Sequence, residues 1–222
     1  MATGDQAIRP RLTRERILAA AVEVADGQGL DGLSMRKLAT AVGFEVMSLY
    51  NHISSKHDLL EGMLELVAAE IRLPEPSAAG WKAELRALAV DQHALLLRHR
   101  WAGPIWLAYF PGPARKAVME MMLELLALGG VEPDLRDVGY HAITLHIGGF
   151  TSQELAYAAQ EARAQELAGR ASAEFPEDTF PRMAQHLRYH LEHDGAAGDE
   201  LDGFGFVLDL ILDGLERRTH AR

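Results

Sequence analysis

The chain has 222 residues, 48% of them hydrophobic and 24% charged, which is the composition of an ordinary globular protein with a sizeable core. It has no cysteine, so disulfides, thiol nucleophiles and cysteine-ligated zinc are excluded. The N-terminus lacks the apolar stretch of a signal peptide, and no apolar run reaches membrane-spanning length. We therefore expect a cytoplasmic protein without a membrane partner.

The formal net charge of −10 argues against binding to a polyanion, but this charge is unevenly distributed. Residues 1–60 carry seven Lys or Arg and seven Asp or Glu, so the rest of the chain carries the whole acidic excess. Four of the seven basic residues lie between Arg9 and Arg16. This cluster predicts a local positive face on an N-terminal part whose net charge is zero.

Residues 1–10 are expected to form a flexible tail. Arg9 and Arg11 either contact phosphate or the minor groove or are simply solvated. Thr13 is a favourable N-cap residue, and an apolar stripe follows it. The pattern predicts a first helix that ends at about Asp26, because Gly27 and Gly29 come next.

Residues 34–56 predict two short helices on either side of Gly43, because apolar residues recur at helical spacing before and after it. Ala39, four residues before that glycine, is small enough for two helices to cross closely. A tight turn then favours a residue that tolerates positive φ. This is the pattern of a helix-turn-helix, whose second helix enters the major groove of DNA.

The predicted hairpin leaves outside a set of polar side chains that a simple core hairpin does not need. Ser34 lies at an N-cap position, so its helix offers backbone N–H groups to an anion. Arg36 can reach a guanine edge. Four further residues are candidates to donate hydrogen bonds to DNA phosphates: Ser48, Tyr50, His52 and Lys56.

The residues that carry a family signal are Ile17-Leu18-Ala20-Ala21, Gly29, Leu33-Ser34-Met35-Arg36, Leu38-Ala39, Gly43 and Ser48-Leu49-Tyr50, followed by His52 and Lys56. In these residues the stretch 12–60 resembles the DNA-binding domain of the tetracycline-repressor (TetR) family of bacterial transcription regulators. The rest of the chain resembles the family in length, helical content and layout. The resemblance implies a dimeric repressor that a small hydrophobic or aromatic ligand releases from a pseudo-palindromic operator in double-stranded DNA.

By the same resemblance, Val46 and Met47 occupy positions of base contact, where they can pack against thymine methyl groups but cannot hydrogen-bond. Asn51 either pairs with adenine or simply ends the helix. The carboxylate of Glu45 departs from what phosphate binding favours, unless it accepts from a cytosine amino group. The resemblance also implies that Ser48, Tyr50, His52 and Lys56 bind phosphate.

The rest of the chain is expected to be helical, so the predicted fold class is all-α. Ser55 and Asp58 form a plausible capping box for a fourth helix, which joins the two parts of the molecule. This fourth helix is predicted at 58–72, and further helices are predicted at 81–99, 114–128, 134–168, around 186–193 and at 204–217. Gly148-Gly149 is a candidate kink in the longest helix. The predicted domains are residues 11–57, which bind DNA, and 58–222, which bind ligand and dimerise.

An aromatic segment between residues 101 and 110, interrupted by glycine and proline, cannot form one smooth helix. Rigid rings of this kind can line a ligand cavity, although each ring alone is explained equally well as ordinary core. Flexible methionines and a few polar groups on later helices complete the predicted lining. The candidate ligand-binding residues are Trp101, Trp106, Tyr109, Phe110, Met119, Met122, Tyr140, His141 and Thr144. Because this lining carries little charge, we expect an apolar or aromatic ligand.

The helices near 134–168 and 201–217 are candidates for pairing with a second subunit. The latter has an apolar face wide enough to contact more than one neighbour, which an internal core position explains almost as well. The family resemblance favours a homodimer through these two helices.

Other functional classes have weaker signals. His186, His190 and His193 have the spacing of metal ligands on one helix face, but their surroundings are polar and a solvated face is the simpler interpretation. No nucleophile elbow, phosphate loop or dinucleotide fingerprint occurs, so we expect neither an enzyme nor a cofactor. A DNA-binding architectural or division protein without a ligand remains the alternative.

Overall fold

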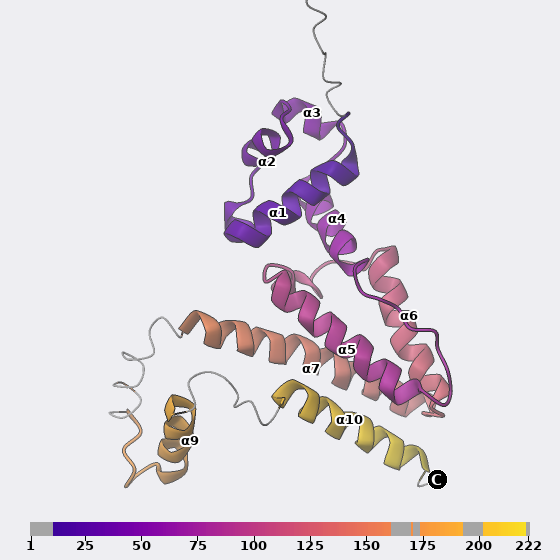
Figure 1. The fold of residues 1–222 in the computed structure, drawn as a ribbon, viewed down its shortest axis with the longest axis vertical. Helices are drawn as coiled ribbons and strands as arrows, with labels where there is room; N and C mark the ends of the chain where they lie inside the picture. Colours follow the sequence, from indigo (N-terminus) through magenta and orange to yellow (C-terminus); the bar gives the residue numbers. More distant parts are fainter. Residues whose placement is uncertain (1–10, 161–169, 171–173, 193–201, 221–222) are drawn as a thin grey trace, which may run out of the picture. The chain divides into compact units, whose positions relative to one another are not determined.

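The computed structural model describes residues 11–160, 170, 174–192 and 202–220, and every regular element in this part is helical (Figure 1). The helices are α1 (Arg14–Gly32), α2 (Met35–Val42), α3 (Val46–Tyr50), α4 (Lys56–Ala68), α5 (Trp81–Arg98), the 3₁₀ turn η1 (Gly103–Ile105), α6 (Pro113–Leu128), α7 (Pro133–Gln160), α9 (Pro181–Glu192) and α10 (Gly203–His220). The predicted all-α fold class is confirmed. The chain forms two compact units: Met1–Glu70 with Arg98–Lys116, and Ile71–Leu97 with Ala117–Arg222.

The first helix is longer than its sequence predicted. Thr13 caps it as expected, and its side chain accepts a hydrogen bond from the Arg16 N–H at 3.3 Å. The helix continues past Gly27 and breaks only at Gly29, where φ is +68°. A glycine ends a helix where its backbone enters the left-handed region, and only Gly29 does so here.

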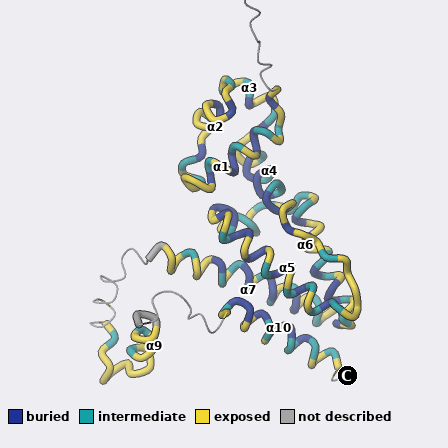
Figure 2. Tube along the Cα trace, in the orientation of Figure 1, coloured by how far each residue is buried: buried dark blue, intermediate teal, exposed yellow. Residues whose placement is uncertain are grey.

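Helices α2 and α3 form the predicted helix-turn-helix. The Ser34 side chain accepts a hydrogen bond from the Lys37 N–H at 3.3 Å, and this caps α2. Gly43 has φ of +76° and donates its N–H to the carbonyls of Ala39 and Thr40, which closes the turn. The side chains under the turn are fully buried (Figure 2) and include Leu38, Leu49 and Ile53.

Asp58 joins the start of α4 to the start of α1 and the end of α3. The Ser55 hydroxyl caps α4 as predicted, but the Asp58 carboxylate returns to Ser54, accepting from its N–H at 2.7 Å and its hydroxyl at 2.9 Å. The same carboxylate accepts from Arg14, which also donates to the His52 carbonyl at 2.9 Å. These bonds, that of Arg14 foremost, lower the pKa of Asp58 from 3.8 to about 2.

The second unit packs α10 against α7, and both contact α5 through side chains such as His93, which lies 2.8 Å from the Thr151 hydroxyl of α7. Lys82 and Arg86 of α5 form ion pairs with acidic side chains of α10, with Arg86 Nε 2.8 Å from Asp209. The buried His93 stacks on Phe204 at 4.0 Å between centroids. Burial lowers the pKa of this histidine, although the nearby carboxylate of Glu154 opposes that shift.

One predicted helix boundary and one predicted kink differ from the structure. Helix α4 ends at Ala68 and not at about Arg72, because the Glu70 N–H bonds to the Val67 carbonyl in a tighter turn. Helix α7 passes through Gly148-Gly149 without a break. Residues 161–168, also predicted to belong to this helix, lie outside the described residues.

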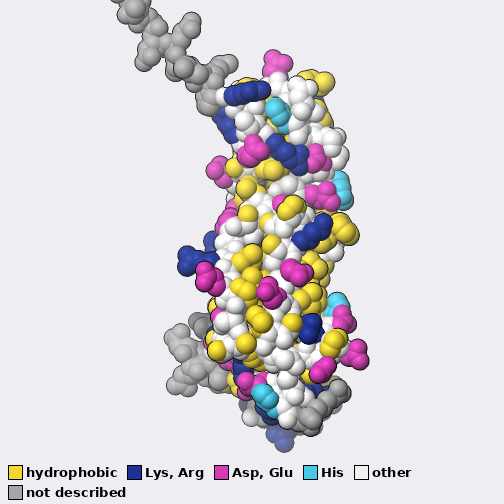
Figure 3. All heavy atoms as spheres, turned by 90° about the vertical axis from the view of Figure 1, so that its right-hand side faces the viewer, with side chains coloured by type: hydrophobic (Ala, Val, Ile, Leu, Met, Phe, Trp, Pro, Cys, Tyr) yellow, Lys and Arg dark blue, Asp and Glu magenta, His cyan; other side chains and the backbone are white. Residues whose placement is uncertain are grey.

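On the face drawn in Figure 3, acidic and basic side chains are interspersed with hydrophobic ones, so that face is not dominated by one sign of charge.

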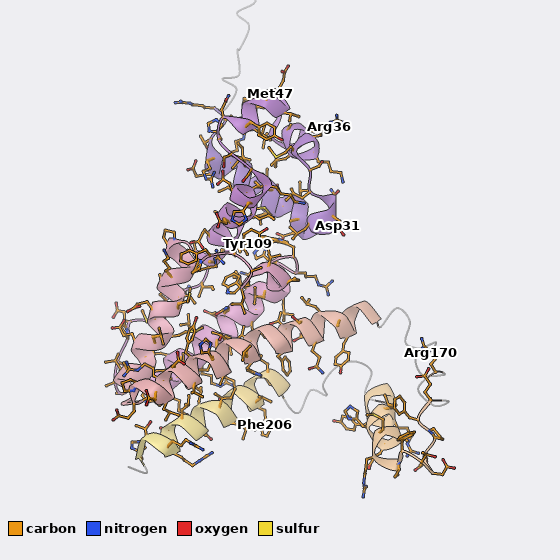
Figure 4. All side chains as sticks on the ribbon, turned by 180° about the vertical axis from the view of Figure 1, so that it is seen from behind. Asp31, Arg36, Met47, Tyr109, Arg170 and Phe206 are labelled. Carbon is orange, nitrogen blue, oxygen red and sulfur yellow. The ribbon has the colours of Figure 1, made fainter. Side chains whose placement is uncertain are left out.

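Asp58→Asn is expected to lower the free energy of unfolding by about 1–2 kcal/mol at neutral pH, after allowance for the partial exposure of the pair. The pKa of Asp58 falls from 3.8 unfolded to about 2 folded, so this contribution is complete well above 3.8 and disappears as pH falls through 2. Urea unfolding of the native protein and of Asp58→Asn, measured from neutral to acid pH, should show that the difference between their free energies of unfolding becomes smaller as pH falls. Asp31→Asn, a change on the exposed surface of α1 (Figure 4), is the matched control.

Candidate functional site

The outer surface of α2 and α3 presents the residues predicted to contact DNA. Met47 is 73% exposed and Tyr50 49% exposed. Figure 4 labels Met47 and Arg36 at the same end of the first unit. Of the other predicted residues, Ser34, Glu45, Asn51 and Lys56 are exposed, and Val46, Ser48 and His52 are half-buried. None of the ten is buried, so all are accessible to a partner within this unit.

A groove of about 700 Å³ lies between α2 and α3. It is lined by Arg36, Ala39, Thr40, Gly43, Phe44, Glu45, Val46 and Ser48. The structure thus brings a guanidinium and a carboxylate to one groove with an apolar wall. Glu45 is the N-cap residue of α3 but makes no side-chain capping bond, so its carboxylate is available to an outside donor. A base edge offers both donors and acceptors to such a surface.

Arg16 stabilises the turn between α2 and α3, a role that the sequence did not reveal. Its guanidinium donates to the Val42 carbonyl at 3.1 Å and lies 5.6 Å from the centre of the Phe44 ring. Arg14 is likewise engaged inside the unit, with Asp58. Two members of the predicted basic cluster therefore position helices, Arg11 is exposed, and Arg9 lies outside the described residues.

The aromatic segment predicted to line a ligand cavity belongs to the first unit, together with the helix-turn-helix. Trp101 is buried and donates its indole N–H to Asp26 of α1 at 2.7 Å. The buried His99 contacts the same carboxylate at 2.8 Å. The ring of Tyr109 lies 4.7 Å from that of His57, at the start of α4. These contacts fasten the segment to α1 and α4.

A buried arginine explains the path of this segment. Arg115, with 3% of its side chain exposed, donates to Glu65 of α4 at 2.7 Å and to the carbonyls of Trp106, Tyr109 and Phe110. Burial alone would raise the pKa of Glu65, but its hydrogen bonds with Arg115 and two backbone N–H groups outweigh burial and lower it.

The remaining candidate ligand residues lie in the second unit. Met122 is buried, Met119 is 36% exposed and His141 is exposed. Thr144 donates its hydroxyl to the Tyr140 carbonyl at 3.0 Å, and burial raises the pKa of the Tyr140 phenol. The nine candidate residues are therefore divided between the units, and neither unit holds the whole predicted lining.

The candidate metal site falls largely on residues whose side chains the structure does not describe. His186 is exposed on α9, the side chain of His190 is not described, and His193 lies outside the described residues. Among the described side chains, no three metal-ligating groups come together. Within the same part of the chain, no helix combines the length and apolar character needed to cross a membrane.

Comparison with known proteins agrees with the helix-turn-helix geometry. The chain is 34% identical to the HTH-type transcriptional repressor DrrR1 of Streptomyces coeruleorubidus, over 94% of this chain and 78% of that protein. It is 29% identical to the tetracycline repressor protein class D of Escherichia coli, over 95% and 92% of the two chains.

Solved structures and family descriptions give the same assignment. The fold matches that of the Streptomyces coelicolor TetR family protein ActR in complex with (S)-DNPA, with a TM-score of 0.76, 26% identity and coverage of 95% and 100%. Residues 17–63 match the description "Bacterial regulatory proteins, tetR family", and residues 73–219 match "Tetracyclin repressor-like, C-terminal domain". The chain belongs to the TetR family of bacterial transcriptional regulators.

Proposed function

We propose that this regulator represses transcription as a homodimer bound to a pseudo-palindromic operator, and that a small apolar or aromatic molecule releases it. The observation that carries the proposal is the helix-turn-helix, which has Arg36, Met47 and Glu45 on its outer surface. The Glu45 side chain makes no capping hydrogen bond. The protein would act in the cytoplasm, where bacterial DNA lies, and would catalyse no reaction.

Within the operator complex, the exposed residues divide between base reading and phosphate binding. We assign base contact to Arg36, Glu45, Val46, Met47 and Asn51, and phosphate contact to Ser34, Ser48, Tyr50, His52 and Lys56. Arg36 and Glu45 line one groove, so a guanine acceptor and a cytosine amino group can be read side by side.

Names of similar proteins support a small-molecule effector. One neighbour, ActR, is described in complex with (S)-DNPA, and several relatives are named tetracycline repressors. In this chain Tyr140 and Thr144, both half-buried on α7, are our candidates for the polar anchor of an effector in the second unit. A movement of the aromatic segment on effector binding would be passed to α1 and α4 through its contacts with them.

Exposed apolar side chains on α7 and α10 support the homodimer. Val138 and Leu145 of α7 are 61% and 66% exposed, and Phe206 and Leu210 of α10 are 49% and 53% exposed. Figure 4 labels Phe206 on α10. Because α7 and α10 pack against each other, these side chains form one candidate surface for a second copy.

Selection of bound sequences from random DNA tests the operator proposal. We expect two inverted half-sites whose centres lie about one helical turn or slightly more apart. Recovery of unrelated sequences would point instead to an architectural protein.

Thermal-shift screening, followed by titration of a hit into free and operator-bound protein, tests the effector: equal affinity in the two states would rule out release by that molecule.

Base reading and phosphate binding should respond differently to substitution. Arg36→Ala is expected to relax the preference at one guanine by about 1–3 kcal/mol if the contact is bidentate. Lys56→Ala should weaken binding to all sequences alike and reduce the salt slope by about one, and Tyr50→Phe should also weaken binding uniformly. Operator titrations at several salt concentrations measure both effects, with Arg72→Ala in the other unit as control. A changed base preference in Lys56→Ala with an unchanged salt slope would contradict the assignment.

Leu145→Asp combined with Leu210→Asp should break the homodimer. A carboxylate buried without a partner costs several kcal/mol, so we expect the dimer dissociation constant to rise by about a hundredfold or more. Sedimentation velocity measures the assembly, and operator affinity should fall with it. Leu107→Asp, at an exposed leucine of the first unit, is the control. Persistence of the dimer in the double variant would place the interface elsewhere.

A further inference from the structure

A cavity of about 560 Å³ lies within the first unit, apart from the DNA-reading groove. Its walls are α1 (Arg14 and Leu18), one face of α4 from Asp58 to Ala69, and the Phe110–Gly112 turn with Arg115. This volume falls in the range of sites that hold small organic molecules.

Two of the residues that line the cavity are glycines whose surroundings leave no space for a side chain. A Cβ atom on Gly62 would lie 2.7 Å from the Leu18 side chain, and one on Gly112 would lie 2.5 Å from Glu65. Glycine at these two positions lets α1 and the turn approach α4 closely. The walls are then fixed by the Arg14–Asp58 and Arg115–Glu65 ion pairs.

Most polar groups around the cavity are already bonded. The Asp58 carboxylate accepts from Arg14 and Ser54, and the Glu65 carboxylate accepts from Arg115 and backbone N–H groups. Glu61 differs. Its Oε1 lies 3.1 Å from the exposed His57 ring, and its Oε2 has no hydrogen-bond partner among the described residues. Because the two arginine–carboxylate pairs cancel, Glu61 gives the lining its net negative charge.

We propose that this cavity binds a small organic cation that carries an aromatic or aliphatic group, which adds a ligand site within the DNA-binding unit to the effector site of the proposed function. The positive group would pair with Glu61, and the apolar part would lie against Leu18, Leu66 and Phe110.

An occupant of this cavity would contact a residue that also supports the reading helix. Arg14 lines the cavity and donates to the carbonyl of His52, two residues after α3 ends. A ligand that shifts Arg14 changes the support of α3, so ligand and operator affinities become linked by one reciprocal factor.

Three probes of similar shape and different charge test the proposal: benzamidinium, neutral benzamide and anionic benzoate. In saturation-transfer NMR and titration with the full-length protein, we expect benzamidinium to bind about tenfold more tightly than benzamide, and benzoate not to bind. Glu61→Gln should remove the preference for the cation. Glu23→Gln, at an exposed acid of α1 away from the cavity, should leave it unchanged.

A blocking variant locates the binding. Ala69→Trp places a large ring in the cavity and should abolish benzamidinium binding, whereas Ala83→Trp on the exposed surface of α5 should not. Melting temperatures of the variants would check that each is folded. Equal binding of the three probes, or binding that survives both Glu61→Gln and Ala69→Trp, would overturn the proposal. The measurement needs no DNA, so its outcome is independent of the operator and effector tests.

Discussion

Arg115 is a guanidinium with almost no access to water, and the first unit is arranged to satisfy it. A buried charge is tolerated only where a counter-charge and hydrogen-bond acceptors replace the lost hydration. Glu65 supplies the charge, and the carbonyls of Trp106, Tyr109 and Phe110 supply the acceptors. Three carbonyls that converge on one side chain cannot all bond along a helix, so this stretch of chain curls around the arginine. The aromatic rings next to these carbonyls are thereby held beside α4.

Glu65 also completes the start of α6. It accepts hydrogen bonds from the backbone N–H groups of Gly112 and Ala114, at 3.0 and 2.7 Å. These groups lie at the beginning of a helix, where no carbonyl of the same helix can accept from them. A side chain from α4 therefore serves as the cap of α6. The negative charge is also favourable at that end of the helix dipole.

Sequence reasoning succeeded where the signal is local. Thr13, Ser34 and Ser55 cap their helices through the next turn, and Gly43 adopts positive φ where two short helices must reverse, so each is visible in a few neighbouring residues. These signals, with the family resemblance, were enough for the fold class and the helix-turn-helix. The exposure of the candidate DNA-contact residues follows from the same short pattern.

The organisation of the aromatic segment was not visible in that way. Its position depends on pairs such as Glu65–Arg115 and Asp26–Trp101, which are 50 and 75 residues apart in the chain. Ring content alone suggested a single cavity in the C-terminal part, whereas these long-range bonds assign the segment to the unit of α1 and α4. The roles of Arg14 and Arg16 were hidden for a related reason. An arginine near an N-terminus looks like a phosphate ligand until the carbonyl or carboxylate that it meets is known.

The membership of residues 98–116 in the first unit bears on how this regulator can be recombined with others. A chimera that joins its N-terminal helices to a foreign body at Glu70 would leave Glu65 without Arg115, and Asp26 without both His99 and Trp101. The transplanted helices would then carry polar side chains without their hydrogen-bond partners. A portable DNA-reading module of this protein is therefore discontinuous in sequence, made of two segments that must be transferred together.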